Sequence, residues 1–141
     1  MLVIDTSVAV KWVIPEDGIG IEADTGAALT LLADELIAPD CILGEFANAL
    51  FKKVQRKEIA VEQARAAFAI LPEAVDFFPS AHLIEPALSL ALDIVHPVHD
   101  CIFLMGAIEH GVELVTADAK FYANCIRTGR SYPIRLLGDD R

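Results

Sequence analysis

The sequence contains little cysteine, and the cysteines it has do not form pairs. Cys41, Cys101 and Cys125 are odd in number, lie far apart and show no Cys-x-x-Cys spacing. A disulfide framework or a cysteine-based metal site is therefore not expected. We predict that all three are reduced thiols in the core of a cytoplasmic protein.

A long uncharged apolar run is also missing. The opening segment, MLVIDTSVAVKW, is apolar, but no basic segment precedes it and Asp5 interrupts it. This pattern fits neither a signal peptide nor a membrane span. We expect a cytoplasmic protein that has no membrane partner.

Positive charge is scarce, with 11 lysines and arginines against 21 acidic residues and a formal net charge of -10. This balance argues against a nucleic-acid partner, because cations usually make the phosphate contacts. Four cations nevertheless form one local group, here named the basic cluster: Lys52, Lys53, Arg56 and Lys57. Since binding responds to the local field as well as to total charge, the cluster is either a solvated helix end or a phosphate-binding face.

The length and the apolar pattern predict one α/β domain. A chain of 141 residues can bury a core without staples, and we expect a single domain over residues 1–141. Short apolar runs alternate with segments of helical periodicity, which is typical of a parallel sheet. The predicted strands are 2–5, 36–38, 75–78, 112–115 and 134–137. The predicted helices are 6–12, 22–35, 42–57, 61–71 (ended by Pro72), 84–95, 100–110 and 118–125.

Four acidic residues occupy positions that set them apart from the others. Asp5 ends a predicted strand and Asp118 follows one, which places both at the carboxyl edge of a parallel sheet. Asp100 lies at a helix start, and Glu45 lies in the first turns of a helix that follows a strand. Taken singly, each acid is better explained as a helix cap or as a complement to the helix dipole. When the four acids are considered together, the predicted topology brings all of them to one edge of the sheet.

Carboxylates that converge in this way need a compensating charge. Two bare carboxylates about 4 Å apart repel by roughly 4 kcal/mol at an effective dielectric of about 20. Magnesium or manganese would offset this repulsion, because both prefer oxygen ligands. Such an ion activates a water and stabilises charge on a phosphodiester. The four acids therefore predict metal-dependent hydrolysis of a phosphodiester.

Other residues near the third acid suggest weaker alternatives. His96 and His99 flank Pro97, but no cysteine pair completes a tetrahedral zinc site. His99 stays a candidate general acid because it adjoins Asp100. Cys101 is better explained as a core thiol than as a nucleophile. The aromatic residues at helical spacing are expected in the core: Trp12, Phe46, Phe51 and Phe103.

Four segments resemble the PIN-domain ribonucleases, and most of all the VapC toxins of toxin-antitoxin pairs. They occur in the family's order and spacing: VIDTSVAVKW, LGEFANAL, HPVHDCIFLMGAIEHG and ELVTADAKF. By this resemblance the family's acidic quartet, which holds magnesium or manganese, matches Asp5, Glu45, Asp100 and Asp118. The family's polar supporting positions match Ser7, Asn48 and Thr116, for which contacts to the quartet or the substrate are expected.

The resemblance also implies a fold, an activity and partners. It implies a three-layer α/β/α fold with a mainly parallel sheet, RNA cleavage by metal-activated water, a homodimer, and silencing by a VapB-like antitoxin. The apolar fraction of 55% independently favours buried subunit contacts. His99 and Cys101 replace the aromatic and the alanine that the family often carries there. The alternatives are a non-catalytic PIN-fold module that binds protein or RNA, and a metal-dependent phosphatase or DNA nuclease.

Overall fold

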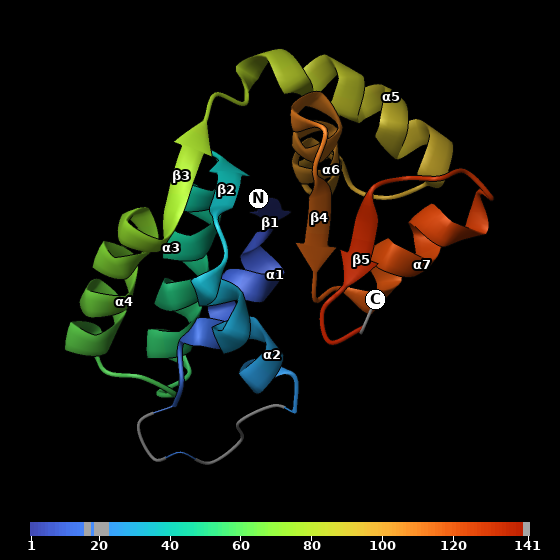
Figure 1. Ribbon diagram of the computed structural model, residues 1–141. Helices are drawn as coiled ribbons and strands as arrows, with labels where there is room; N and C mark the ends of the chain where they lie inside the picture. Colours follow the sequence, from blue (N-terminus) through green and yellow to red (C-terminus); the bar gives the residue numbers. More distant parts are fainter. Residues whose placement is uncertain (16–17, 19–22, 140–141) are drawn as a thin grey trace.

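A parallel β-sheet forms the centre of the molecule, in a computed structural model that describes residues 1–15, 18 and 23–139. Within these residues five strands pair in the order β3-β2-β1-β4-β5 (Figure 1). The strands are β1 (Leu2–Ile4), β2 (Leu36–Pro39), β3 (Val75–Phe78), β4 (Glu113–Thr116) and β5 (Ile134–Leu136). Every pairing is parallel, so the carboxyl ends of all these strands lie at one edge of the sheet.

Helices cover both faces of this sheet. The α-helices are α1 (Thr6–Ala9), α2 (Thr25–Thr30), α3 (Ile42–Gln55), α4 (Val61–Ala74), α5 (Ile84–Ile94), α6 (Val98–His110) and α7 (Ala119–Arg127). Short 3-10 turns are η1 (Val10–Trp12), η2 (Leu31–Ala33) and η3 (Ala81–Leu83). Helices α1 to α4 form one group, whereas α6 packs on β1, β2 and β4 with α5 and α7 beside it (Figure 1). Right-handed crossovers place the two groups on opposite faces, which confirms the predicted three-layer α/β/α fold.

Helix α6 is the most deeply buried helix next to the sheet. Its residues Cys101 to Leu104 are buried, and fully burying a side chain such as Phe103 contributes about 1.5–3 kcal/mol. Gly106 faces the ring of Phe78, where an added Cβ would lie 2.5 Å from a ring carbon. This close approach packs α6 tightly against Phe78 at the end of β3.

The direction of α6 brings its first turn to the edge where the strands end. Gly111, with φ of +65°, ends α6 in the left-handed region and leads directly into β4. The helix therefore runs antiparallel to the strand that follows it. Its first turn, which contains Asp100, lies at the carboxyl edge of the sheet.

No single helix among the described residues is long and apolar enough to cross a membrane. The segments Ala81–Ile94 and Val98–His110 satisfy the length and composition criteria for a membrane span when they are taken together. They are, however, bent by 111° relative to each other.

Two predicted helix boundaries are wrong. Pro72 does not end α4, which continues to Ala74. Because Pro72 is exposed in the last turn, the carbonyl that loses its N–H donor lies near solvent, and the cost of the proline is small there. The helix predicted over 100–110 begins at Val98, after Pro97 as its N-cap. Proline suits a helix start because its missing N–H would have had no helical partner.

Two further expectations need correction. The helix predicted over 22–35 covers only Thr25 to Ala33 as α2 and η2, and residue 22 lies outside the described residues. Phe51 was expected in the core but is 60% exposed. The buried stripe of α3 carries Phe46 and Leu50, and Phe51 is turned about 100° away from Leu50 around the helix.

Candidate active site

Asp5 is a buried carboxylate at the end of the central strand. It follows β1 directly, is only 4% exposed and caps α1 by accepting a hydrogen bond from the Val8 amide at 3.3 Å. Its Oδ1 also accepts from Ser7 Oγ at 2.5 Å, and its Oδ2 accepts from Thr116 Oγ1 at 2.5 Å. These donors hold the carboxylate in one orientation at the carboxyl edge.

Thr116 connects this first acid to the fourth. Thr116 ends β4 and is fully buried, and its Oγ1 also accepts from the Asp118 amide at 3.1 Å. Ser7 contributes to the same bridge, because its Oγ accepts from the Ala117 amide at 2.8 Å. Asp118 then caps α7 by accepting from the Phe121 amide at 3.1 Å. The ends of β1 and β4 are thus tied together through side chains.

Glu45 reaches the same edge from the first turn of α3. Its Oε1 accepts from Thr6 Oγ1 at 2.9 Å, so the residue after Asp5 positions the second acid. Glu45 is partly buried, and that burial raises the pKa of its carboxyl. The nearby charge of Asp100 raises this pKa further, whereas Thr6 and His99 lower it.

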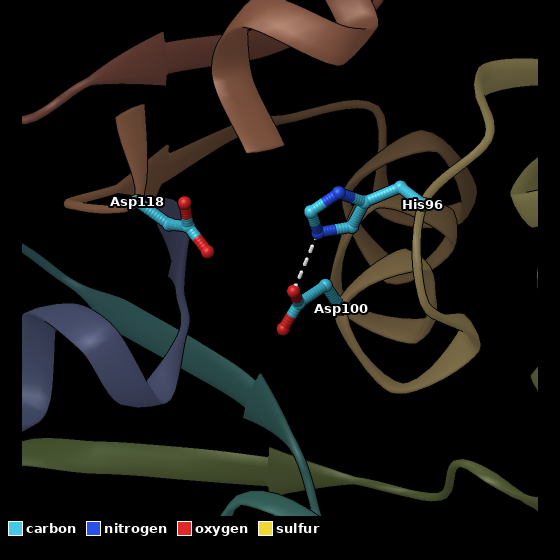
Figure 2. Close-up of side chains that lie close together, drawn as sticks. All are labelled: His96, Asp100 and Asp118. Carbon is cyan, nitrogen blue, oxygen red and sulfur yellow. Dashed lines mark hydrogen bonds and ion pairs between the residues drawn. The ribbon is translucent and has the colours of Figure 1, made fainter. Parts of the chain in front are cut away.

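Asp100 lies within reach of the other three acids. It does not cap α6, since Pro97 is the N-cap, and it occupies the first turn instead. One ligand atom from each of His96, Asp100 and Asp118 lies within 4.8 Å of the others. Figure 2 shows these three side chains around a common space. The charge of Asp100 also raises the pKa of Asp5 and of Glu45, so both acids lie near it, although neither belongs to the group of ligand atoms within 4.8 Å of one another.

Asp5 contributes a buried negative charge to this group of acids. Burial is the main cause that raises the pKa of Asp5 from 3.8 to about 6. Hydrogen bonds from Ser7 and Thr116 lower this pKa, and the charge of Asp100 raises it. The free protein therefore carries a destabilising charge at this site near neutral pH, and a bound cation would offset it.

The oxygens of the cluster fit a hard cation. One oxygen of each of Glu45, Asp100 and Asp118 is hydrogen-bonded, to Thr6, His96 and the Phe121 amide respectively, and His99 Nε2 lies 3.7 Å from the other oxygen of Asp100. In the described part of the chain, the second oxygen of each accepts no hydrogen bond, and carboxylate oxygens in this number are what magnesium and manganese prefer. These four acids could hold such an ion.

The three expected supporting residues differ in placement. Ser7 and Thr116 lie inside the cluster, as described above. Asn48 is exposed on α3, and within the described ranges it makes no hydrogen bond to the four acids. Its expected contact with the substrate stays a prediction.

The other candidates at the third acid also have defined positions. His99 is mostly exposed, and its Nε2 lies 3.7 Å from Asp100 Oδ1. Cys101 is fully buried, and burial raises the pKa of its thiol to about 12, which suits a core residue and not a nucleophile. In the basic cluster, Lys53 pairs with Glu58 at 3.6 Å.

Sequence reasoning missed a polar chain behind Asp100. His96 Nε2 lies 2.6 Å from Asp100 Oδ2, and His96 Nδ1 lies 3.0 Å from Asn124 Nδ2. Arg127 NH1 donates to Asn124 Oδ1 at 3.0 Å. The spacing of His96 and Asp100 was visible in the sequence, but nothing there links them to Asn124 and Arg127 on α7.

Comparison with known proteins identifies the family. A model of the PIN domain matches residues 2–126, so the chain belongs to the PIN-domain family, and the predicted resemblance is confirmed. No curated protein matches the sequence.

Several solved structures share the fold. PAE2754 from Pyrobaculum aerophilum matches with a TM-score of 0.70 and 15% identity, over 96% of this chain and 88% of that one. VapC20 from Mycobacterium tuberculosis, a Sarcin-Ricin loop cleaving toxin, matches with a TM-score of 0.63 and 21% identity, over 87% and 94%. A toxin-antitoxin complex from Klebsiella pneumoniae matches with a TM-score of 0.58 and 16% identity, over 87% and 91%. At these identities the likeness is one of fold.

Proposed function

We propose that this chain is a metal-dependent endoribonuclease and the toxin component of a toxin-antitoxin pair. The observation that carries the proposal is the cluster of Asp5, Glu45, Asp100 and Asp118 at the carboxyl edge of the sheet. Membership of the PIN-domain family supports it, since PIN domains are in general nucleases. Magnesium or manganese, when bound by these acids, would supply an activated water and charge stabilisation on a phosphodiester.

The chain's own residues would prepare the site for this chemistry. Ser7 and Thr116 hold both oxygens of Asp5, so little reorganisation is needed when a cation arrives. Asp5 and Asp100 are the expected direct ligands, and Glu45 and Asp118 would act directly or through water. Thr6 orients Glu45 from the same turn that Asp5 caps.

The choice of RNA as substrate rests on the fold relatives and on charge placement. VapC20 is a Sarcin-Ricin loop cleaving toxin, and its fold covers most of this chain. The basic cluster lies at the end of α3, whose first turn carries Glu45. At about 1.5 Å per residue, Lys52 and Lys53 of this cluster lie roughly 10–12 Å along the helix from Glu45. A structured RNA substrate could contact both places at once.

Two protein partners belong to the proposal. The Klebsiella toxin-antitoxin complex supports a VapB-like antitoxin for this chain. Exposed apolar side chains on α5 support a homodimer, with Leu92 73% exposed and Leu88 49% exposed. Light scattering at micromolar concentration should give the mass of a dimer, and a monomer would contradict this part.

Cleavage by the purified chain tests the activity. RNA in magnesium or manganese should be cut internally by the native chain and left intact by Asp5→Asn and Asp100→Asn variants. A DNA of the same sequence separates a ribonuclease from a DNA nuclease. Activity that persists in excess EDTA, or in either variant, would refute the mechanism. Complete absence of cleavage, combined with tight RNA or protein binding, would favour a non-catalytic binding module.

A further inference from the structure

The polar chain behind Asp100 connects three separate elements. His96 lies in the turn between α5 and α6, and Asn124 and Arg127 lie on α7. Arg127 NH2 also donates to the Ile94 carbonyl at 3.0 Å, which fixes the guanidinium at the end of α5. The ring of His96 stacks on Phe121, with centroids 4.6 Å apart and planes 16° from parallel. The imidazole of His96 is thus fixed by the stacking contact with Phe121 and by hydrogen bonds at both ring nitrogens.

The hydrogen bonds define which nitrogen of His96 carries the proton. An arginine can only donate, so Asn124 presents its carbonyl oxygen to Arg127 and its NH₂ group to His96. The amide NH₂ can also only donate, so His96 Nδ1 must accept. The ring proton therefore resides on Nε2, which donates to Asp100 Oδ2 at 2.6 Å.

The backbone before His96 ends α5 with Val95 as a left-handed C-cap. Val95 has φ of 57°, in the left-handed region that branched side chains rarely adopt. The Val95 side chain is 74% exposed, so packing of its own side chain does not explain this conformation. The turn carries His96 into the buried space beside Phe121.

We propose that His96 is a positioning residue: Arg127 and Asn124 fix its Nε2–H tautomer, and this N–H holds Asp100 so that Oδ1 faces the acidic cluster. The role of Asp100 in holding a cation rests on the proposed function, whereas the assignment of the His96 tautomer does not. Asp100 Oδ2 accepts from His96, which leaves Oδ1, 3.7 Å from His99 Nε2, as the oxygen without a hydrogen bond that a ligand could use. Figure 2 shows the ring reaching Asp100 with the Asp118 carboxylate close by.

The competing role for His96 is direct ligation through nitrogen. One of its ring nitrogens lies within 4.8 Å of oxygens of Asp100 and Asp118, which is close enough for a shared ion. Ligation would require a bare nitrogen, however, and Asn124 already occupies Nδ1 while Nε2 carries the proton. The chain of donors from Arg127 therefore favours positioning over ligation.

Side-chain nitrogen NMR tests the tautomer without any substrate. A long-range ¹H–¹⁵N spectrum of the metal-free protein should show His96 protonated at Nε2 and bare at Nδ1, with the signal assigned from a His96→Gln sample. In Asn124→Asp, which offers only acceptors, Nδ1 should gain a proton. An Nδ1–H tautomer in the native chain, or no change in Asn124→Asp, would overturn the proposal. The NMR measurement tests the tautomer even if other His96 variants fail to fold.

Kinetics and cation binding test the positioning. His96→Leu should lower both kcat and Mn²⁺ affinity by roughly 10-fold to 100-fold, with KM for RNA little changed. His96→Gln places an amide N–H near the Nε2 position and should recover most of both losses. His82, which pairs with Glu109 at 2.8 Å on the surface, provides the matched control, and His82→Leu should change neither quantity.

The outcomes separate this proposal from the proposed function. If His96→Gln is impaired as much as His96→Leu, or if Nε2 loses its proton when Mn²⁺ is added, His96 does not act by positioning. If the native chain binds Mn²⁺ with the expected dependence on His96 but cuts no RNA, the ribonuclease proposal fails and the positioning role stands.

Discussion

Replacing Asp5 by asparagine should stabilise the metal-free protein while abolishing its proposed activity. Asp5 is 4% exposed, and its pKa is raised from 3.8 to about 6, chiefly by burial. The folded state therefore binds this proton more tightly than the unfolded state. Stability is lost as pH rises from about 4 to about 6, and the loss is complete above that range. At about 1.4 kcal/mol for each pKa unit, the charge costs about 3 kcal/mol at pH 7.

Asparagine removes the charge but also weakens the hydrogen bonds from Ser7 and Thr116, so we expect a net gain of about 1–2 kcal/mol. Urea unfolding in EDTA, followed from pH 4 to pH 8, measures it. The difference between Asp5→Asn and the native chain should grow from pH 4 to about pH 6 and then stay constant up to pH 8. Asp76→Asn, an exposed change on β3, is the control and should have little effect.

Added magnesium supplies the second half of this test. It should raise the unfolding midpoint of the native chain, because a ligand that binds only the folded state stabilises it. It should not do so for Asp5→Asn. The reasoning is refuted if Asp5→Asn is less stable than the native chain at pH 7 in EDTA, or if the difference does not depend on pH.

Four further changes test other parts of the structure. Thr116→Val removes the hydroxyl that donates to Asp5, and calorimetry should show weaker Mn²⁺ binding by a protein that is still folded. Val95→Asn relieves a left-handed backbone and should raise the urea-unfolding free energy by about 1 kcal/mol. Gly106→Ala forces a Cβ against Phe78 and should lower that free energy by about 1–3 kcal/mol. Replacing the basic cluster by glutamine in an inactive background should reduce the salt dependence of RNA affinity, with a slope smaller by up to about 3 in an anisotropy titration. Unchanged binding, stability or slope would contradict the respective prediction.

The sequence predicted the strands and the relation of the acids to them because both depend on local patterns. Asp5 and Asp118 directly follow buried apolar runs, and parallel pairing puts the ends of such runs at one edge. The two readings of these aspartates, capping and clustering, turn out to be compatible, since each caps a helix and also faces the cluster. Asp100 departs from the pattern because Pro97, not the acid, begins α6.

The polar chain behind Asp100 could not be predicted because it depends on tertiary packing. Asn124 and Arg127 meet His96 only after α7 packs beside α5, and no sequence period relates these residues. The exposure of Phe51 has a similar cause, since the rotation of α3 against the sheet decides which aromatic is buried. A sequence pattern describes one helix or strand at a time, whereas these contacts join two or more elements.

The central claim is that four acids distant in sequence hold one hard cation between them. Anomalous diffraction at the manganese edge, from crystals of the native chain grown with Mn²⁺, tests this claim directly. The account predicts a peak bounded by carboxylate oxygens of Asp5, Glu45, Asp100 and Asp118, and no such peak in crystals of Asp100→Asn. A native crystal saturated with Mn²⁺ that shows no peak there, or a peak bound only by other residues, would contradict the account.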